Sequence, residues 1–219
     1  MVNDLADRDV RQRELVPPDK LLEMPATVVG VGAIGRQVAL QLAAIGVPSI
    51  QLIDFDTVEV ENLAPQGFYP ADIGTPKVEA VADVCRAINP DIEVYTANRK
   101  FRSLQFTVGA FFCCVDGIET RKQIFNSIIE RADFFVDGRM SAEYLRVLTV
   151  HDDASREHYP TTLFPSSEAY QGPCTAKSTI YCSNVAAGIM VSQFAQWLRG
   201  YPVDKDIDLN LLTNEMGAK

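Results

Sequence analysis

Residues 27–54, TVVGVGAIGRQVALQLAAIGVPSIQLID, contain a complete strand–turn–helix–strand pattern. Thr27–Val31 is a short, mostly β-branched run that ends in glycines. Ile34–Ile45 has the apolar spacing of a helix, and Gly46 can end that helix in a left-handed conformation. Ser49–Ile53 is a second apolar run of strand length. The stretch therefore predicts a βαβ unit near the start of the chain.

Three glycines, Gly30, Gly32 and Gly35, form a G-x-G-x-x-G loop between the first strand and the helix. In such a loop the first glycine permits a tight turn, the second lets the backbone approach a phosphate, and the third packs the helix against the sheet. Asp54 ends the second strand, where an acid can accept hydrogen bonds from ribose hydroxyls. The combination predicts a nucleotide site. The same loop and acid serve NAD, FAD, S-adenosylmethionine and ATP, so a dehydrogenase stays open at this point.

The rest of the chain continues to alternate between strand-like and helical segments. The further predicted elements are strands at Ile92–Thr96, Ala110–Val115, Phe134–Val136 and Leu145–Val150, and helices at Pro76–Ile88, Glu119–Arg131 and Asn184–Leu198. Strands and helices that alternate at these lengths imply a parallel sheet with right-handed crossovers. The expected fold class is α/β, with a Rossmann-like, mostly parallel sheet, helices on both faces, late antiparallel strands and a long crossover loop.

The length and composition fit a single domain over residues 1–219. With 47% apolar and 22% charged residues, the chain has ample material for one core. We divide the domain into a body with an N-terminal arm (1–24), a crossover loop (151–180) and a C-terminal tail (201–219). The crossover loop is predicted because residues 152–172 are polar, contain two prolines and show no periodicity.

The charge balance and the cysteines limit the partners and the compartment. Twenty Lys and Arg stand against 29 Asp and Glu, a net charge of −9, which argues against nucleic-acid binding through phosphate contacts. Residues 1–13 lack the apolar region of a secretory signal, and the longest uncharged run, Ser178–Leu198, fits a core helix better than a membrane span. The five cysteines include no C-x-x-C pair. We therefore expect a cytoplasmic protein with reduced thiols and no membrane partner.

Five polar residues beyond the second strand add to the predicted nucleotide site. Asp56, Asn62 and Gln66 follow that strand, and Lys77 comes directly after a proline that can begin a helix. The ammonium group of this lysine would lie near the positive end of the helix, where anionic phosphates bind. Asp116 follows the fourth strand at its carboxyl end, where ligands gather in parallel sheets. A phosphate-binding lysine and a metal-capable carboxylate favour a triphosphate with Mg²⁺ over NAD.

The sequence resembles the ThiF/MoeB family of ubiquitin-activating-type adenylating enzymes over about residues 8–200. The resemblance rests on VVGVGAIGRQVALQLAAIGVPSIQLIDFDTVEVENLAPQ, DIGTPKVEAV, INPDIEV and CCVDG. It implies a Rossmann-like fold that binds ATP and Mg²⁺. The positions that it implies as binding residues are Gly30, Gly32 and Gly35 for the phosphates, Asp54 for the ribose, Asn62 and Lys77 for phosphate, Asp116 for Mg²⁺, and Asp56 and Gln66 within the same nucleotide site.

Two positions, Arg11 in the N-terminal arm and Pro65, bear on how the negative charge of ATP would be neutralised. Residues 8–12, RDVRQ, resemble the family's R-x-x-R-Q segment, which implies that Arg11 reaches the ATP of the partner subunit in a homodimer. Pro65 stands where the family usually has a phosphate-binding arginine, and Arg36 and Arg99 are the candidates to compensate. The paired C-x-x-C motifs of many family members are absent, so no structural zinc is expected.

Cys174 is the candidate nucleophile. It lies 14 residues before Gly188, the spacing at which sulfur-carrier-activating relatives carry a reactive cysteine. A thiolate there could attack an acyl-adenylate to give a thioester or an acyl disulfide, and Lys177 would lower its pKa. Cys113 and Cys114 lie in a predicted buried strand, so we expect them to be inert.

The expected activity is ATP- and Mg²⁺-dependent adenylation of the C-terminal glycine carboxylate of a ubiquitin-like or sulfur-carrier protein. A downstream conjugating or sulfur-transfer protein would then receive the activated group. One alternative is a non-catalytic binding subunit, which the missing arginine at position 65 supports. Another is a member of the same superfamily directed at a small molecule or an RNA. An NAD-dependent dehydrogenase ranks third, because no histidine is placed for hydride chemistry.

Overall fold

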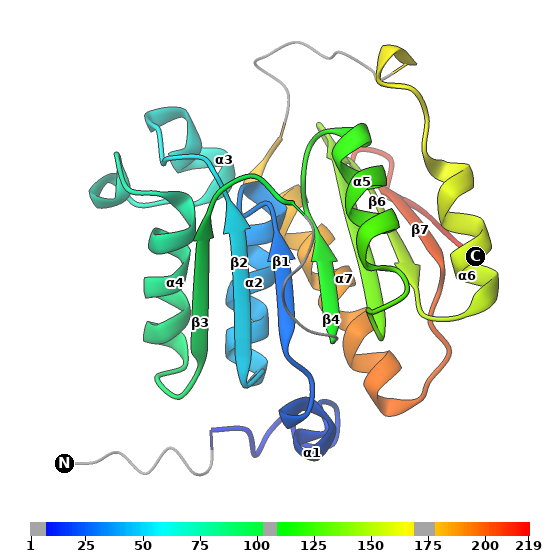
Figure 1. The fold of residues 1–219 in the computed structure, drawn as a ribbon, viewed down its shortest axis with the longest axis horizontal. Helices are drawn as coiled ribbons and strands as arrows, with labels where there is room; N and C mark the ends of the chain where they lie inside the picture. The colour runs from blue at the N-terminus through cyan, green and yellow to red at the C-terminus, as the bar shows by residue number, and fades with distance from the viewer. Residues whose placement is uncertain (1–7, 103–108, 169–177) are drawn as a thin grey trace.

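The computed structural model describes residues 8–102, 109–168 and 178–219, and these form a single sheet with helices on both faces (Figure 1). The strands are β1 (Ala26–Val29), β2 (Ser49–Asp54), β3 (Glu93–Asn98), β4 (Ala110–Cys113), β5 (Phe134–Ser141), β6 (Tyr144–Val150), β7 (Asp206–Asn210) and β8 (Glu215–Ala218). Their order across the sheet is β3-β2-β1-β4-β5-β6-β7-β8. The first five strands pair in parallel, and the last three add to the sheet in antiparallel fashion.

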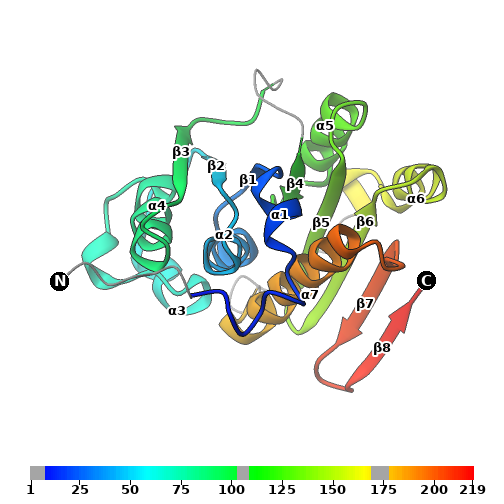
Figure 2. The ribbon, with the colours of Figure 1, turned by 90° about the horizontal axis from the view of Figure 1, so that it is seen from below.

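Helices cover the two faces of the sheet unequally. The helices are α1 (Pro18–Leu22), α2 (Ala33–Ile45), α3 (Leu63–Gln66), α4 (Lys77–Ile88), α5 (Ile118–Ile128), α6 (Asp153–His158) and α7 (Ile180–Arg199). Figure 2 shows α2, α4 and α7 on one face, and α5 and α6 on the other. Two clusters of buried apolar residues correspond to these faces, the larger one under α2, α4 and α7. Because both faces are covered, the central strands are buried along their whole length, as in β1 and β4.

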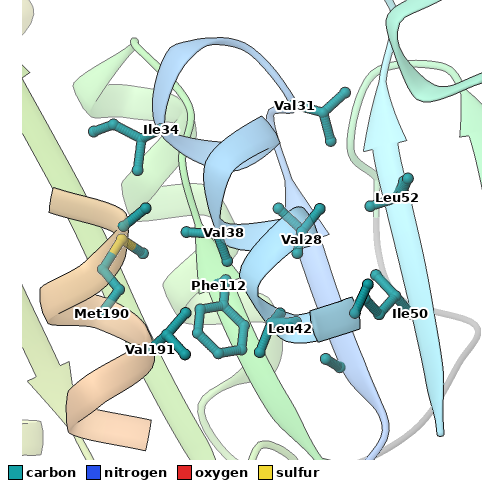
Figure 3. Packing of buried hydrophobic residues seen from close by; sticks show 14 of the residues in the cluster. Val28, Val31, Ile34, Val38, Leu42, Ile50, Leu52, Phe112, Met190 and Val191 are labelled. Carbon is teal, nitrogen blue, oxygen red and sulfur yellow. The ribbon is translucent and has the colours of Figure 1, made fainter. Parts of the chain in front are cut away.

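Helix α2 anchors the larger core directly behind the glycine loop (Figure 3). Its side chains Ile34, Val38 and Leu42 recur every four residues and therefore share one helix face. Val38 and Leu42 are fully buried, together with Val28 of β1 and Phe112 of β4. This packing fixes the start of α2 relative to the ends of β1 and β4, and so fixes the loop between them.

The predicted fold class is confirmed, including the parallel sheet, the helices on both faces and the late antiparallel strands. The prediction that the chain past the last helix is a plain tail is wrong in detail, because residues 206–218 form β7 and β8 at the edge of the sheet. Strand β5 extends to Ser141 instead of ending at Val136, since the charged residue that follows Val136, Asp137, is buried within the sheet and the strand pairs with β6 as far as Ser141. Among the described residues, no helix combines the length and the apolar character that a membrane crossing requires.

The crossover segment also contains more structure than predicted. Within 151–168 it forms α6 and a 3-10 helix at Tyr159–Thr162. Asp152 caps α6, because its carboxylate accepts a hydrogen bond from the amide of Ser155 at 2.8 Å. The last helix begins at Ile180, four residues before the predicted start, and Thr179 caps it through a 3.3 Å hydrogen bond from Cys182 N. Short helices held by side-chain caps leave no apolar periodicity to detect.

A buried carboxylate joins the antiparallel strands to the crossover segment. Asp206 on β7 is 3% exposed and accepts two hydrogen bonds from the guanidinium of Arg146 on β6, at 2.8 and 2.7 Å. His158 Nε2, on α6, lies 2.9 Å from Asp206 Oδ2. Burial alone would raise the pKa of this carboxyl group, but the hydrogen bonds from Arg146 and His158 outweigh it and lower the pKa to about 2.

We expect Asp206→Asn to lower the free energy of unfolding at pH 7 by about 2 kcal/mol, because the folded state lowers the carboxyl pKa by nearly two units. A carboxyl group with a lowered folded-state pKa stabilises the protein above its unfolded pKa, and this contribution is lost as pH falls toward 2. Urea unfolding of both proteins at pH 7 and pH 3 measures the difference. The difference in the free energy of unfolding between the two proteins should be smaller at pH 3 than at pH 7. A difference that is constant with pH would contradict this account.

Candidate nucleotide site

The glycine loop connects β1 to α2, and two of its glycines are required by backbone packing. Gly30 has φ +82°, and a Cβ atom there would lie 2.7 Å from the carbonyl oxygen of Cys114. A Cβ atom on Gly35 would lie 1.7 Å from the carbonyl oxygen of Gly30. Gly32 is different, since the nearest atom to its Cβ position is Gln66 Oε1 at 3.5 Å. The backbone at Gly32 is therefore the part of the loop that a ligand can approach closely.

Asp54 ends β2 and holds the glycine loop in place. Its Oδ2 atom accepts a hydrogen bond from the amide of Val31 at 2.7 Å, and its Oδ1 atom accepts one from the amide of Asp56 at 2.9 Å. The residue is only partly buried. Because each carboxylate oxygen can accept two hydrogen bonds, both oxygens keep capacity for the hydroxyl groups of a ribose.

Lys77 is a buried cation beside this loop. It begins α4, and its Nζ atom lies 3.0 Å from Asp56 Oδ2. The lysine side chain is 7% exposed, whereas the aspartate side chain is 46% exposed. An ammonium group held at a helix N-terminus adds to the positive potential of the helix, so the pair presents a fixed cation at the carboxyl edge of the sheet.

Asn62 and Gln66 flank the loop from the segment between β2 and α4. Asn62 Oδ1 accepts a hydrogen bond from the amide of Glu59 at 3.0 Å, so its NH₂ group is the half that can face a ligand. Gln66 Oε1 is buried and has no hydrogen-bond partner among the described residues. Because this atom is also the nearest neighbour of the Cβ position of Gly32, an unpartnered polar group lies against the open part of the glycine loop.

Asp116 lies at the same edge, just past the carboxyl end of β4, and is exposed. Within the described ranges, no group of three or more His, Cys, Asp or Glu side chains gathers as a metal site. Mg²⁺ in nucleotide sites is bound by one or two carboxylates, several waters and the phosphates themselves. A single exposed carboxylate beside the glycine loop fits an ion of that kind, and it does not fit a metal held by protein ligands alone.

Arg11 is not part of this group of residues. The N-terminal arm packs against the C-terminal end of α2, where the guanidinium of Arg8 donates to the carbonyl oxygens of Ala43 and Ala44 at 3.4 and 3.2 Å. The glycine loop lies at the other end of the same helix. Arg11 itself is exposed. Within one chain it therefore lies at the opposite end of the sheet from the predicted nucleotide site.

Cys174 and Lys177 fall outside the described residues. The four other cysteines are free. Burial raises the pKa of each of these thiols: to about 12 in Cys85, to about 11 in Cys182, and above the ordinary value in Cys113 and Cys114. A thiol with a raised pKa is protonated at neutral pH and is a poor nucleophile, so none of these four suits nucleophilic catalysis.

A buried charge cluster beside the site was missed at the level of sequence. Asp137 on β5 is fully buried and pairs with Arg121 of α5 and, at 2.8 Å, with Arg139. Tyr159 Oη donates to the same carboxylate at 2.9 Å. Arg139 also donates to the carbonyl and hydroxyl oxygens of Thr162, at 2.8 and 3.1 Å. The cluster thus fastens the first part of the crossover segment to the sheet next to β4.

Comparisons with known proteins show the family of the chain. The ThiF family model matches residues 8–216. Molybdopterin-synthase adenylyltransferase of Salmonella typhimurium is 34% identical over 112 residues, which are 48% of this chain and 45% of the relative. Ubiquitin-like modifier-activating enzyme 5 of Culex quinquefasciatus is 30% identical over 123 residues, which are 48% of this chain and 31% of the relative. The matched region thus spans less than half the length of these curated relatives.

Two solved structures share the fold. The crystal structure of PaaA superposes with a TM-score of 0.78 at 19% identity, over 100% of this chain and 74% of PaaA. The crystal structure of Escherichia coli MccB with ATP superposes with a TM-score of 0.71 at 16% identity, over 92% of this chain and 65% of MccB. At these identities the likeness concerns the fold alone.

Proposed function

The chain belongs to the ThiF family, and from that premise we propose that it uses ATP to adenylate the C-terminal carboxylate of a ubiquitin-like or sulfur-carrier protein. The observation that carries the proposal is the buried ammonium group of Lys77, which the exposed carboxylate of Asp56 holds beside the glycine loop. A dinucleotide-dependent dehydrogenase needs the loop and the acid at Asp54, but it has no use for a fixed cation at this point. A triphosphate does, because its charge must be neutralised when it binds and reacts.

In the proposed reaction, a carboxylate oxygen of the carrier attacks the α-phosphorus of ATP. The new phosphorus–oxygen bond forms as the bond to the β-phosphate breaks, and pyrophosphate leaves with the electron pair. Asp54 would hold the ribose, the amides of the glycine loop would face the phosphates, and Lys77 would neutralise the charge that builds on them. Asn62 would donate its NH₂ group to a phosphate oxygen. Mg²⁺, held by Asp116 and the triphosphate, would supply further charge neutralisation.

The carrier tail would enter beside the crossover segment. Arg139 fixes Thr162 of this segment to β5, and β5 lies next to the strand that leads to Asp116. A tail that lies between the sheet edge and this fixed segment would bring its terminal carboxylate toward the glycine loop and be shielded from water. We place the reaction in the cytoplasm, with a downstream conjugating or sulfur-transfer protein as the acceptor of the activated group.

Exchange of radiolabelled pyrophosphate into ATP tests this function. We expect exchange that depends on a carrier protein with a C-terminal glycine, together with calorimetric binding of ATP and no binding of NADH. If the protein bound NADH and did not bind ATP, the result would contradict the proposal and favour a dehydrogenase. Binding of ATP without exchange, for any carrier tried, would favour the second candidate, a non-catalytic binding subunit. Pro65, at a position where the family usually has arginine, is the observation in favour of that candidate.

We also propose that Arg11 completes the site of a second subunit in a homodimer. Its exposed position, at the far end of α2 from its own glycine loop, supports a role in another chain's site. Arg11→Ala should therefore lower exchange at least about tenfold without changing the oligomeric state. A mixture of Arg11→Ala with a variant inactive at Lys77 should regain part of the activity in mixed dimers. Full activity in a species that sedimentation shows to be monomeric would contradict this arrangement.

The thiol of Cys174 is proposed to act after adenylation, by attacking the acyl-adenylate with release of AMP and formation of a thioester. The raised pKa values of the four described cysteines support it by elimination. Adenylation needs no thiol, so Cys174→Ser should leave pyrophosphate exchange within about twofold of wild type. The same variant should lose any covalent adduct with the carrier that thiols can cleave. Equal adduct formation by both proteins would show that the reaction stops at the adenylate.

A further inference from the structure

Arg36 is a buried cation whose charge the described structure does not neutralise. It follows the third glycine of the loop directly, in the first turn of α2, and is 4% exposed. Across residues 8–102, 109–168 and 178–219, its guanidinium has no ion pair or hydrogen bond, and its Nε atom is buried without a partner. The contacts that it does have are with two aromatic rings, Phe68 at 5.3 Å and Tyr69 at 5.7 Å from the guanidinium carbon.

Burial of a charge without a counter-ion is costly, so the contrast with other buried arginines is informative. Arg121 is also buried, and Arg139 is partly buried, but both bind the carboxylate of Asp137. Stacking on aromatic rings stabilises a cation by less than the burial of an ion costs. The fold therefore keeps a positive charge at Arg36 that would be stabilised by an anion from outside the described structure.

The position of Arg36 connects this charge to the glycine loop. Its Nη1 atom is 3.2 Å from the Cβ position of Gly67. Gln66, the preceding residue, has the unpartnered Oε1 atom that lies 3.5 Å from the Cβ position of Gly32. Two polar side chains without partners thus flank the segment at 66–67 that faces the loop. An amide can present either its oxygen or its NH₂ group, so Gln66 can join Arg36 in binding an anion.

We propose that Arg36 binds the pyrophosphate end of the ATP triphosphate, and supplies the charge that Pro65 does not. Asp54 would hold the ribose on the β2 side of the loop, and Arg36 lies past the third glycine on the other side, toward 66–67. Arg36 is then a specificity-determining residue that distinguishes ATP from AMP. The inference rests on the proposed function, because it takes ATP as the nucleotide.

Calorimetry with ATP and AMP, on wild type and on Arg36→Met, Arg36→Lys and Lys100→Gln, tests the inference. Methionine retains an apolar stem under the two rings and removes the charge. We expect Arg36→Met to weaken ATP binding about tenfold to a hundredfold, the range for a lost charge-assisted hydrogen bond, and to leave AMP binding within about twofold. Arg36→Lys should weaken ATP binding by less than Arg36→Met does, because lysine retains the positive charge. Lys100 is exposed just past β3 at the same edge, so its variant controls for general electrostatics and should bind both nucleotides as wild type does.

The melting temperature of the nucleotide-free protein gives a second readout. Arg36→Met should melt at the same temperature as wild type or higher, because it removes an unpaired buried charge. Failure of this variant to fold, equal loss of ATP and AMP binding, or unchanged ATP binding would each overturn the inference. Unchanged ATP binding by the variant would leave the proposed function standing. Absence of ATP binding by the wild-type protein would overturn both together.

Discussion

Lys77→Ala is expected to lower the rate of pyrophosphate exchange at least about a hundredfold, since a preorganised charge aimed at the reacting phosphates contributes this much to catalysis. The side chain is 7% exposed and is held in one position by Asp56. Its loss removes a fixed cation that solvent ions cannot replace in the same place. Exchange assays at saturating ATP and carrier measure the effect on the chemical step, and calorimetry measures the effect on ATP binding.

Two variants separate this role from an effect on folding. Lys122→Ala removes an exposed lysine from α5, near the same edge of the sheet, and should exchange at the wild-type rate. Asp56→Asn keeps the lysine and loosens its position, so it should lower exchange by less than Lys77→Ala does. If Lys77→Ala retained exchange within about fivefold of wild type while folding normally, the lysine would serve structure alone and the proposed mechanism would lose its main support.

Asp137→Asn is expected to lower the free energy of unfolding by about 3–5 kcal/mol, because it leaves one buried and one partly buried guanidinium group without their counter-ion. Arg121 and Arg139 both bind this carboxylate, and Tyr159 donates to it. Burial already lowers the pKa of each arginine, which shows that their charges are held at a cost. Urea unfolding at pH 7 measures the change.

An exposed ion pair provides the matched control for this prediction. Asp83 lies 3.2 Å from Arg86, with side-chain exposures of 79% and 46%. Asp83→Asn should change the free energy of unfolding by less than about 0.5 kcal/mol, because exposed pairs are hydrated and screened. If Asp137→Asn cost no more than Asp83→Asn, the buried cluster would not be holding the crossover segment to the sheet.

The fold could be predicted to the extent that its signals are local. The strand, glycine loop and helix at 26–45 show β-branched residues, three glycines and a four-residue apolar spacing within one short window. The strands β7 and β8 could not be identified in this way. Residues 206–210, DIDLN, pair with β6 and lie at the rim of the sheet, so only part of each strand is buried. Their stability comes from distant strands and not from their own composition.

The candidate site likewise contains residues that could be predicted from the sequence and a pairing that could not. Asp54, Lys77 and Asp116 could be placed together from sequence because the carboxyl ends of parallel strands meet at one edge. The pairing of Asp137 with Arg121 could not, because it joins a strand to a helix across the face of the sheet. A charged residue directly after an apolar run is usually the end of a strand, and the sequence alone does not show that Arg121, 16 residues earlier, lies against Asp137.

The central position of β1 has a consequence for the order of events during synthesis. β1 is paired on one side with β2 and on the other with β4, so that Ala26 lies opposite both Ile50 and Ala110. Strand β1 is made before both of these strands, and it therefore waits for the second of them until the ribosome has passed residue 113. In the interval its β4-facing edge has no strand to pair with, which is the state in which nascent chains aggregate or bind chaperones. Strands β6 and β8 each pair with the strand directly before them in the chain, so these pairings form quickly, whereas β7 reaches β6 only after the crossover segment and α7 have been made. Folding of this chain should thus be limited by the closure of β4 onto β1.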